Sequence, residues 1–372
     1  MNWKTKRLAD LITLERGFDL PKSSRIPGNV PVISSGKVEG THNKAKIKGP
    51  GFTIGRATNL GRPRWSDIDY WPLNTTLYAK DFHGNNPRWL YYLFMVMDLS
   101  GYDSGSVQPM LNRNYISEIP IQVPSIKEQD SIVSCISALD DKIAGNNKII
   151  SSSQEVVMAL AQKCNTSVLI KTLASKSTQT LNPQTLDHQQ VLHYSIPAFD
   201  KGHVDIENAK NIKSSKFQLN EPCVLVSKLN PRIPRVWSVP TINQSMHALA
   251  STEFIVLEPI NCTCGQLFAA VSQPSLFLQL QAQASGTSNS HQRIKPDDLS
   301  NALVPDTREL PNNDVELLNS LNLLIECRTQ ENQTLARTRD ELLPLLMSGK
   351  ITVRDAEEAS AEVGVDKHEV EE

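Results

Sequence analysis

The sequence contains an internal repeat. Residues 105–124 read GSVQPMLNRNYISEIPIQVP, and residues 286–305, which lie 181 positions later, read GTSNSHQRIKPDDLSNALVP. The two segments align without a gap, and each ends in a short apolar run closed by a proline, Pro124 or Pro305. A repeat over this distance predicts two similar structural units that present two similar surfaces.

A long amphipathic segment follows each copy. Its apolar residues recur at alternating intervals of four and three, which is the spacing of a coiled-coil seam. The seam returns 185 residues later, and its polar interruptions Asn146 and Ser153 recur as Glu331 and Thr338. The predicted seam residues are Ile132, Ile136, Leu139, Ile143, Ile150, Val157 and Leu160 in the first helix, and Leu317, Leu321, Leu324, Leu335, Leu342 and Leu345 in the second.

Charge is unevenly distributed along the 372 residues, although the formal net charge is only −2. Residues 1–124 hold 16 Lys and Arg against 10 Asp and Glu, whereas the last 18 residues hold eight acidic residues and one lysine. This pattern predicts basic globular units and a disordered acidic tail from Asp355. We find no signal peptide, no apolar run near the roughly 20 residues that cross a bilayer, and no disulfide framework among the six cysteines, so we expect a cytoplasmic protein.

Basic residues cluster in one proline-containing loop of each unit, directly after a short apolar strand. The first cluster includes Arg56, Arg62 and Arg64, and its counterpart includes Lys228, Arg232 and Arg235. Such side chains can bind phosphates or the edges of guanine bases. A solvated loop is the alternative for either cluster alone, but recurrence in both repeats favours DNA contact. We expect the neighbouring Trp65 and Trp237 to be core anchors rather than base-stacking residues.

Polar side chains also gather in the loops that follow Gly105 and Gly286, where a simple turn cap is the alternative interpretation. A further polar and basic run extends from Lys37 to Lys48. Together with the basic clusters, these segments complete the set of candidate DNA-binding residues. This set is Lys37, Lys44, Lys46, Arg56, Asn59, Arg62, Arg64, Gln108, Asn112, Arg113, Lys228, Asn230, Arg232, Arg235, Asn289, Ser290, His291 and Arg293.

Motifs for catalysis are missing from the sequence. There is no GxxxxGK[ST] phosphate loop, no Asn-Pro-Pro-Tyr run of the usual amino-methyltransferases and no nuclease spacing after Pro296-Asp297-Asp298. The pair Cys262 and Cys264 is a weak metal signal that ordinary cysteines explain better. We therefore predict no catalytic residue, no cofactor site and no metal site in this chain.

The motifs that flank the first helix resemble those of the specificity subunit of type I restriction-modification enzymes. The run Ile119-Pro-Ile-Gln-Val-Pro124, then Glu128-Gln129, then Leu139-Asp140-Asp141-Lys142-Ile143, is similar to the spacer signature of that family. The opening Arg7-Leu8-Ala9-Asp10-Leu11-Ile12 and the run from Leu342 to Ile351 are also typical of it, so the resemblance covers residues 1–354.

The second half departs from this pattern in two places. Leu324-Ile325-Glu326-Cys327 stands where the family pattern has Leu-Asp-x-Lys-Ile, and residues 166–195 read unlike the start of the chain. We expect two recognition domains that diverge in detail.

The resemblance implies an α+β fold with a pseudo-twofold internal repeat. Two β-rich target recognition domains would be joined by two long antiparallel coiled-coil helices, and about 30 helical residues span roughly 50 Å, more than the ~34 Å of one DNA turn. The implied boundaries are 1–124 for the first recognition domain, 125–165 for the first spacer helix, 166–305 for the second recognition domain, 306–354 for the second spacer helix and 355–372 for the tail.

The resemblance also implies a function. The chain would read a bipartite, asymmetric site on double-stranded DNA and dock two methyltransferase subunits, and through them restriction and translocase subunits, in host defence. It would perform no chemistry, so S-adenosylmethionine, ATP and magnesium would belong to those partners. The alternatives are a recognition subunit of a methyltransferase-only system and a stand-alone architectural DNA-binding protein; the basic loops disfavour a coiled-coil scaffold without nucleic acid.

Overall fold

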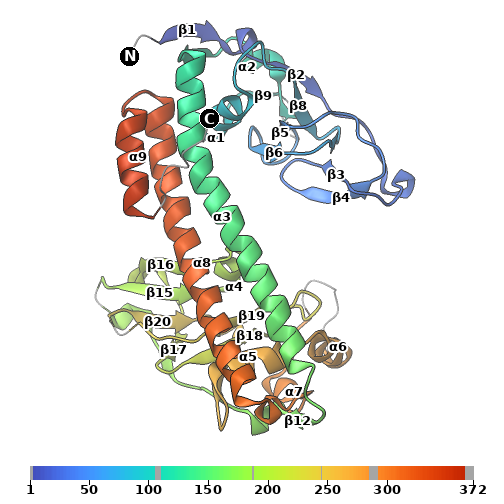
Figure 1. Ribbon diagram of the computed structural model, residues 1–372, viewed down its shortest axis with the longest axis vertical. Helices are drawn as coiled ribbons and strands as arrows, with labels where there is room; N and C mark the ends of the chain where they lie inside the picture. Colours follow the sequence, from blue (N-terminus) through green and yellow to red (C-terminus); the bar gives the residue numbers. More distant parts are fainter. Residues whose placement is uncertain (1–2, 105–109, 187, 244, 285–291, 365–372) are drawn as a thin grey trace. The chain divides into compact units, whose positions relative to one another are not determined.

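The computed structural model of this chain describes residues 3–104, 110–186, 188–243, 245–284 and 292–364. β-rich domains alternate with long helices along the chain, which confirms the α+β class and the two-domain, two-helix organisation (Figure 1). Internal contacts divide the chain into two compact units: Met1–Lys142 with Leu335–Glu372 (unit 1), and Ile143–Thr334 (unit 2). Each unit therefore contains one β-rich domain and one end of each long helix.

Unit 1 is built around a four-stranded antiparallel sheet. Its central strand β5 is buried at all five positions because it carries the apolar run that includes Phe52 and Ile54. The sheet order is β2 (Thr13–Arg16), β8 (Thr76–Asp81), β5 (Gly51–Gly55) and β6 (Pro63–Ser66). A three-stranded sheet has the order β4 (Val38–His42), β3 (Val30–Ile33) and β7 (Trp71–Pro72), and the pairs β1 (Lys4–Arg7) with β11 (Pro120–Val123) and β9 (Asp103–Ser104) with β10 (Met110–Leu111) complete the domain.

Unit 2 repeats this topology. Its four-stranded sheet has the matching order β13 (Ala174–Lys176), β21 (Phe254–Pro259), β18 (Cys223–Ser227) and β19 (Val236–Val239). A five-stranded sheet has the order β14 (Thr180–Leu181), β17 (Lys216–Leu219), β20 (His247–Ala250), β15 (Gln190–Tyr194) and β16 (Asp205–Asn208), and β12 (Ser167–Leu169) pairs with β22 (Leu303–Pro305). Strands β15 and β20 pair in parallel, as β3 and β7 do in unit 1. The repeat in the sequence is thus a repeat of folded domains.

The start of the second domain has the same local structure as the start of the first, although the two sequences differ. The 3-10 helix η1 (Leu8–Asp10) corresponds to η3 (Ile170–Thr172), and each follows a short strand. Leu8 and Leu11 are buried at 1% and 0% exposure, and Ile170 and Leu173 are both at 0%. Only the apolar positions that face the core are shared, which explains why the sequence similarity is weak here.

Short helices cover the sheets. Helix α1 (Pro87–Val96) begins at Asn86, whose side chain accepts hydrogen bonds from the Arg88 and Trp89 amides, and α5 (Cys264–Val271) begins at a Thr263 capping box. The remaining short helices are α2 (Arg113–Ile116), α4 (Ile196–Lys201), α6 (Pro274–Gln283) and α7 (Pro296–Ser300), with 3-10 helices η2 (Lys22–Ser24), η4 (Pro183–Thr185), η5 (Ala209–Asn211) and η6 (Thr307–Glu309).

Two 36-residue helices, α3 (Ile126–Ala161) and α8 (Asn312–Met347), run antiparallel and pack together. The polar interruption of the predicted seam joins them, because Asn146 Nδ2 donates to Glu331 Oε2 at 3.0 Å and to Asn332 Oδ1 at 2.9 Å. Positions that the sequence repeat makes equivalent therefore meet each other. Ser153, the second polar interruption on α3, is also buried, at 5% exposure.

The predicted seam is correct for most of α3 and partly wrong for α8. Leu317 and Leu345 are exposed by 42% and 36%, whereas the adjacent Leu318 and Leu346 are buried. Leucines occupy both members of each pair, so the sequence pattern leaves the register open by one residue. Burial against the β-rich domain decides it at Leu318, which belongs to a cluster with Leu267 and Leu310.

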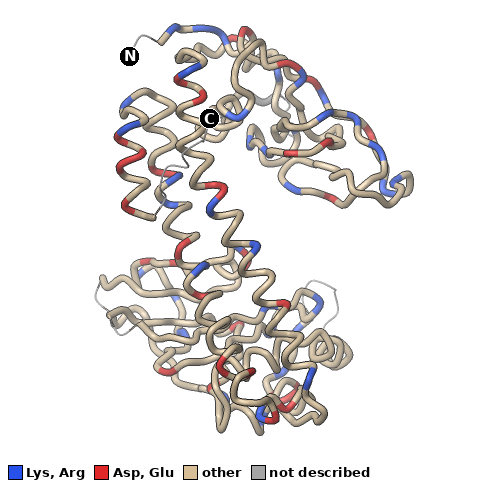
Figure 2. The backbone as a smooth tube through the Cα atoms, viewed as in Figure 1, with Lys and Arg blue, Asp and Glu red and all other residues tan. Residues whose placement is uncertain are grey.

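The prediction of a disordered tail from Asp355 is wrong for the first residues of that segment. Residues Val353–Glu362 form helix α9, which begins at a Thr352 capping box with Asp355. Ala356 and Ser360 are buried, so the helix packs through small side chains, and its acidic residues lie on other positions (Figure 2). A face made of alanine and serine gives little apolar signal in a sequence, and residues 365–372 lie outside the described part of the chain.

None of the described helices is both long enough and apolar enough to cross a membrane.

Candidate nucleic-acid interface

The first basic cluster lies on the loop that connects β5 to β6. Backbone hydrogen bonds from Gly55 N to Arg62 O and from Arg62 N to Asn59 O, both 3.0 Å, close this loop. Asn59 has a φ of 49°, a left-handed conformation that Asn tolerates better than most residues. The loop therefore holds Arg56 and Arg62 at its two ends.

The second basic cluster lies on the equivalent loop between β18 and β19. Ser227 N donates to Arg235 O at 3.0 Å, and Ile233 N donates to Asn230 O at 2.9 Å. Asn230 has a φ of 47°, so each of the two loops contains one Asn in the left-handed conformation. The same backbone geometry thus presents basic residues in both domains.

The structure joins each basic loop to the polar segment that was predicted separately. In unit 1, Leu111 N donates to Arg56 O at 2.8 Å. In unit 2, Ile294 N donates to Lys228 O at 3.0 Å, and Asn230 N donates to Gln292 O at 2.8 Å. The two candidate segments of each domain therefore form one surface. Four candidates, Gln108, Asn289, Ser290 and His291, fall outside the described residues.

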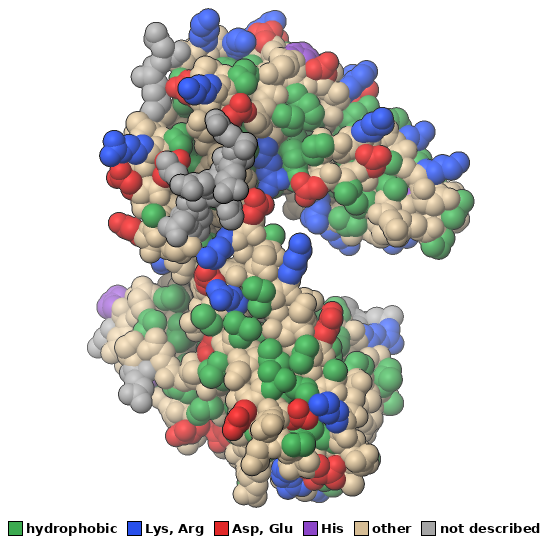
Figure 3. Space-filling view, in the orientation of Figure 1, with side chains coloured by type: hydrophobic (Ala, Val, Ile, Leu, Met, Phe, Trp, Pro, Cys, Tyr) green, Lys and Arg blue, Asp and Glu red, His purple; other side chains and the backbone are tan. Residues whose placement is uncertain are grey.

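Several of the candidate side chains are available to a ligand. Lys37, Lys44 and Arg232 are exposed, Arg56 is half-buried, and none of these four has an acidic partner among the residues that the structure describes. Arg62 is exposed as well. Hydrogen bonds from Ser100 lower the pKa of Asp98, and the positive charge of Arg62 lowers it slightly further. Lysine and arginine side chains are visible over the surface of both units in the space-filling view (Figure 3).

Other candidates in unit 1 are held by contacts within the chain. The Lys46 ammonium lies 5.3 Å from the centre of the Trp71 ring, and Arg64 Nη1 donates weakly to Gly36 O at 3.4 Å. Arg113 Nη1 donates to Leu14 O at 3.3 Å. The amide candidates have structural roles too, since Asn59 Nδ2 donates to Ser35 O and Asn112 caps α2.

In unit 2 the Lys228 ammonium donates to Thr252 O at 2.7 Å, and burial lowers its pKa from the ordinary value. Arg293 pairs with Glu253 at 2.9 Å but remains 60% exposed. Asn230 Oδ1 is buried and accepts no hydrogen bond from the described residues. Lys228 and Arg293 therefore border the surface, although each already has a partner.

Arg235 differs from the expectation that its side chain faces DNA. Its guanidinium donates from Nε to Asp200 Oδ1 at 2.6 Å and from Nη2 to Asp200 Oδ2 at 2.9 Å, and the side chain is only 11% exposed. This bidentate pair lowers the pKa of Asp200 and fixes the end of α4 to strand β19. The side chain has a structural role because its partner, 35 residues away in sequence, covers it.

The two tryptophans pack against aromatic neighbours within their domains. The Trp65 ring lies 5.6 Å from that of Tyr91 and carries the Arg88 guanidinium over its face at 4.6 Å. The Trp237 ring lies 4.8 Å from Tyr194 and 5.6 Å from Phe199. These contacts agree with anchors of the fold.

Sequence analysis missed an ion cluster that attaches α1 to the long helices in unit 1. Asp140 accepts from Tyr92 Oη at 2.7 Å and from Arg339 Nη1 at 2.9 Å, and Arg88 Nη2 lies 3.5 Å away. Asp140 belongs to the spacer motif, and this motif was the only sequence feature that could have pointed to the ion cluster. Its partners are distant in sequence, and the pattern alone did not identify them.

The described residues contain no group of three or more His, Cys, Asp or Glu side chains arranged to hold a metal ion. Cys262 and Cys264 lie in largely buried surroundings that raise the pKa of both thiols, to about 11 for Cys262. The surface itself offers guanidinium, ammonium and amide groups on rigid β hairpins. This chemistry suits contacts with phosphates and base edges.

Comparison with known proteins identifies the first domain. The family model "Type I restriction modification DNA specificity domain" matches residues 1–152. A search of curated proteins found no match. The solved S subunit of the type I restriction-modification system from M. genitalium covers 93% of this chain and 96% of its own, with 13% identity and a TM-score of 0.58. This likeness shows a shared fold.

Two further solved structures have lower TM-scores. The HsdS subunit from Thermoanaerobacter tengcongensis has 14% identity and a TM-score of 0.29, and covers 97% of this chain and 96% of its own. A structure on complex assembly and conformational transition of the type I R-M system has 13% identity and a TM-score of 0.33, and covers 95% and 97%. The match over residues 1–152 confirms the resemblance found in this part of the sequence: residues 1–152 are similar to the type I restriction modification DNA specificity domain.

Proposed function

We propose that this chain is the DNA-recognition subunit of a type I restriction-modification complex and that its two β-rich domains each read one half of a bipartite, asymmetric DNA site. The observation that carries the proposal is the recurrence of one surface in both units. In each unit a basic hairpin loop with an Asn in the left-handed conformation is hydrogen-bonded to a returning polar segment. The family match supports a DNA-specificity role for the first domain, and the shared topology extends the same role to the second.

The chain recognises DNA and leaves catalysis to its partners. We propose that it docks two methyltransferase subunits, which in turn hold the restriction and translocase subunits of a cytoplasmic host-defence system. S-adenosylmethionine, ATP and magnesium act in those partners. The side chains on the surface described above bind and orient DNA: Arg56, Arg62 and Arg232 are placed for phosphates or guanine edges.

The proposal is tested by methylome sequencing of a host that expresses this chain with its methyltransferase partner. We expect methylation at one bipartite sequence, and we expect it to disappear when the chain is omitted. Replacing Arg56 and Arg62 together with alanine should reduce methylation, whereas Lys4→Ala, which removes an exposed charge on β1 outside the surface, should not. Methylation that does not depend on the chain would contradict the proposal.

A further inference from the structure

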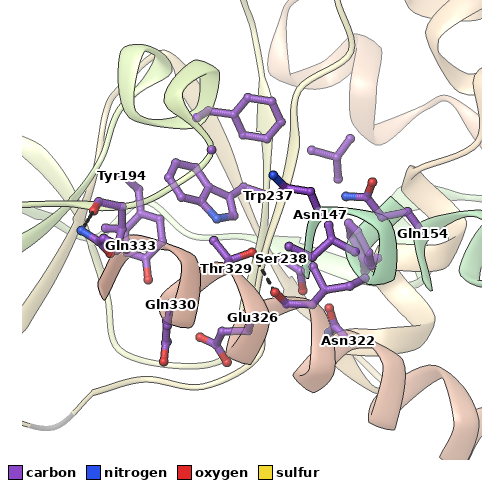
Figure 4. Close-up of a pocket in the computed structure, with 17 residues that line it drawn as sticks. Asn147, Gln154, Tyr194, Trp237, Ser238, Asn322, Glu326, Thr329, Gln330 and Gln333 are labelled. Atoms are coloured by element: carbon purple, nitrogen blue, oxygen red, sulfur yellow. Dashed lines mark hydrogen bonds between the residues drawn. The ribbon is translucent and has the colours of Figure 1, made fainter. Parts of the chain in front are cut away.

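A cavity of about 230 Å³ lies in unit 2, where the β-rich domain meets the ends of α3 and α8 that belong to this unit. Trp237 and Tyr194 contribute aromatic rings to its wall (Figure 4). Helix α3 contributes Asn147 and Gln154, and α8 contributes residues that include Glu326 (Figure 4). The cavity is thus lined by aromatic faces, neutral polar groups and one acidic side chain.

Glu326 is the only charged residue among those that line the cavity. Thr241 Oγ1 donates to its Oε2 at 2.9 Å, and no described residue supplies a cation. Burial raises the pKa of the Glu326 carboxyl above its ordinary value, because an ionised carboxylate is poorly solvated there. Asn322, which also lines the cavity and is 2% exposed, has an Oδ1 atom that accepts no hydrogen bond from the described residues. The cavity therefore contains a carboxylate with one hydrogen-bond donor and no cation, and an amide oxygen that has no donor among the described residues.

The corresponding place in unit 1 is filled by the chain's own arginines. Arg88 from α1 lies over the Trp65 ring at 4.6 Å and within 3.5 Å of the Asp140 carboxylate on α3. Arg339 from α8 donates to the same carboxylate at 2.9 Å. In that unit, guanidinium groups occupy the space between a tryptophan and a helix carboxylate.

The internal repeat shows that unit 2 has no arginine at the two equivalent positions. Counting from the capping residues Asn86 and Thr263, the α5 position equivalent to Arg88 is Gly265. The helix repeat of 185 residues makes Gln154 the equivalent of Arg339. Trp237 remains as the counterpart of Trp65, and Glu326 supplies a carboxylate one position beyond the equivalent of Asp140. A carboxylate and an aromatic face are retained, while both cations are absent.

We propose that this cavity binds a guanidinium group supplied from outside the chain, stacked on Trp237 and paired with Glu326. A planar guanidinium matches a carboxylate with two donors and stacks on aromatic faces, so it would satisfy the acceptors that the chain leaves open. The site is distinct from the DNA surface, because a half-buried carboxylate with no cation beside it repels phosphate. The guanidinium comes either from an arginine of a partner protein or from a small free guanidine.

The full-length chain, labelled with 5-fluorotryptophan at its five Trp residues, can be titrated with N-acetylarginine amide and followed by fluorine NMR. We expect the Trp237 resonance, assigned with Trp237→Phe, to shift saturably. Glu326→Gln should weaken binding at least tenfold, whereas Glu316→Gln, which removes an exposed carboxylate from the same helix away from the cavity, should leave it unchanged. Gln154→Arg, which restores an arginine at the position of Arg339, should abolish binding while the chain stays folded.

The two sources are separated by measuring assembly with the methyltransferase subunit. If a partner arginine fills the cavity, Glu326→Gln weakens assembly and N-acetylarginine amide competes with it. If the ligand is a free guanidine, the compound binds but assembly is unchanged. The proposal is overturned if the compound causes no saturable Trp237 shift and Glu326→Gln does not alter assembly, or if Glu326→Gln binds the compound as tightly as the wild type.

Discussion

At the residue scale, two arginines of the same loop illustrate how burial decides a role. Arg232 is exposed and without an acidic partner in the described chain, whereas Arg235 is covered by Asp200. An exposed guanidinium remains free to pair with phosphate, while a buried one with two hydrogen bonds stabilises the fold. Arg232 is therefore a candidate DNA contact, whereas Arg235, three positions later, has a structural role.

We predict different consequences for the alanine variants of these two residues. Arg232→Ala should lower DNA affinity of the assembled complex for all sequences and flatten the salt dependence by about one unit if the side chain binds phosphate, or cost about 1–3 kcal/mol at one base position if it reads guanine. Arg235→Ala should instead lower the free energy of unfolding by about 1.5–3 kcal/mol. Binding at several salt concentrations and urea unfolding distinguish the two; unchanged binding for Arg232→Ala would remove it from the interface.

The Asp200–Arg235 pair also predicts a pH dependence. Arg235 lowers the pKa of Asp200 below its ordinary 3.8, so the folded state binds the proton less readily than the unfolded state. The pair's contribution to stability is therefore fully present above about pH 4 and is lost as the pH falls through the lowered pKa. When the pH falls from 5 to 2, the free energy of unfolding should decrease less for Asp200→Asn than for the wild type, because asparagine does not take up a proton. Identical pH profiles of the two proteins would show that the pair does not stabilise the fold.

Sequence patterns predicted where basic residues cluster but not which of them are free. Arg235 and Asp200 are 35 residues apart, and Arg88 and Asp140 are 52 apart, so the pairs form only when helices and sheets are packed. Backbone geometry was equally hidden, although the two Asn residues at φ near 48° are a recognisable signal once the loops are aligned.

At the element scale, the long helices show what periodicity does and does not determine. The spacing of apolar residues located both helices and their polar interruption, because a buried stripe must recur along one face. It did not fix the register of α8 at Leu317–Leu318, where either leucine fits the pattern. It also missed α9, whose buried face is made of Ala356 and Ser360.

The polar contact in the seam leads to a prediction about helix pairing. Asn146, at 4% exposure, donates to Glu331 and Asn332, and these bonds exist only in one register. Replacing Asn146 with leucine should stabilise the helix pair but permit slipped or oligomeric forms, as polar residues in other coiled-coil seams trade stability for specificity. Urea unfolding and light scattering measure the two effects. A variant that is less stable and wholly monomeric would count against this role.

At the scale of the whole molecule, the repeat is the feature that sequence predicted best. Gapless similarity between residues 105–124 and 286–305 corresponds to matching strand orders around β5 and β18. The cavity beside Trp237 could not be predicted, because it is enclosed by residues of α3, α8 and the sheet that lie far apart in the sequence. Such a space becomes visible only when the two folded units are compared.

The structure improves the design of a spacing experiment. Ile150 and Leu335 are equivalent in the repeat, but Asn146 and Glu331 are the equivalent residues that pair directly. Inserting one heptad after Asn147 and one after Gln330 should therefore lengthen both helices while preserving the pairs on either side. Seven residues add about 10.5 Å, or roughly three base pairs if the helices set the spacing along DNA. A folded, active variant with an unchanged gap in its methylated site would contradict the proposal that the helices act as a ruler.

We propose that each β-rich domain reads one half of the DNA site. The most direct test replaces residues 1–124 with the matching domain of another family member and determines the methylated sequence of a host that expresses the hybrid with the methyltransferase partner. We expect one half of the bipartite sequence to change while the other half stays the same. Methylation of an unchanged sequence, or of a site altered in both halves, would contradict it.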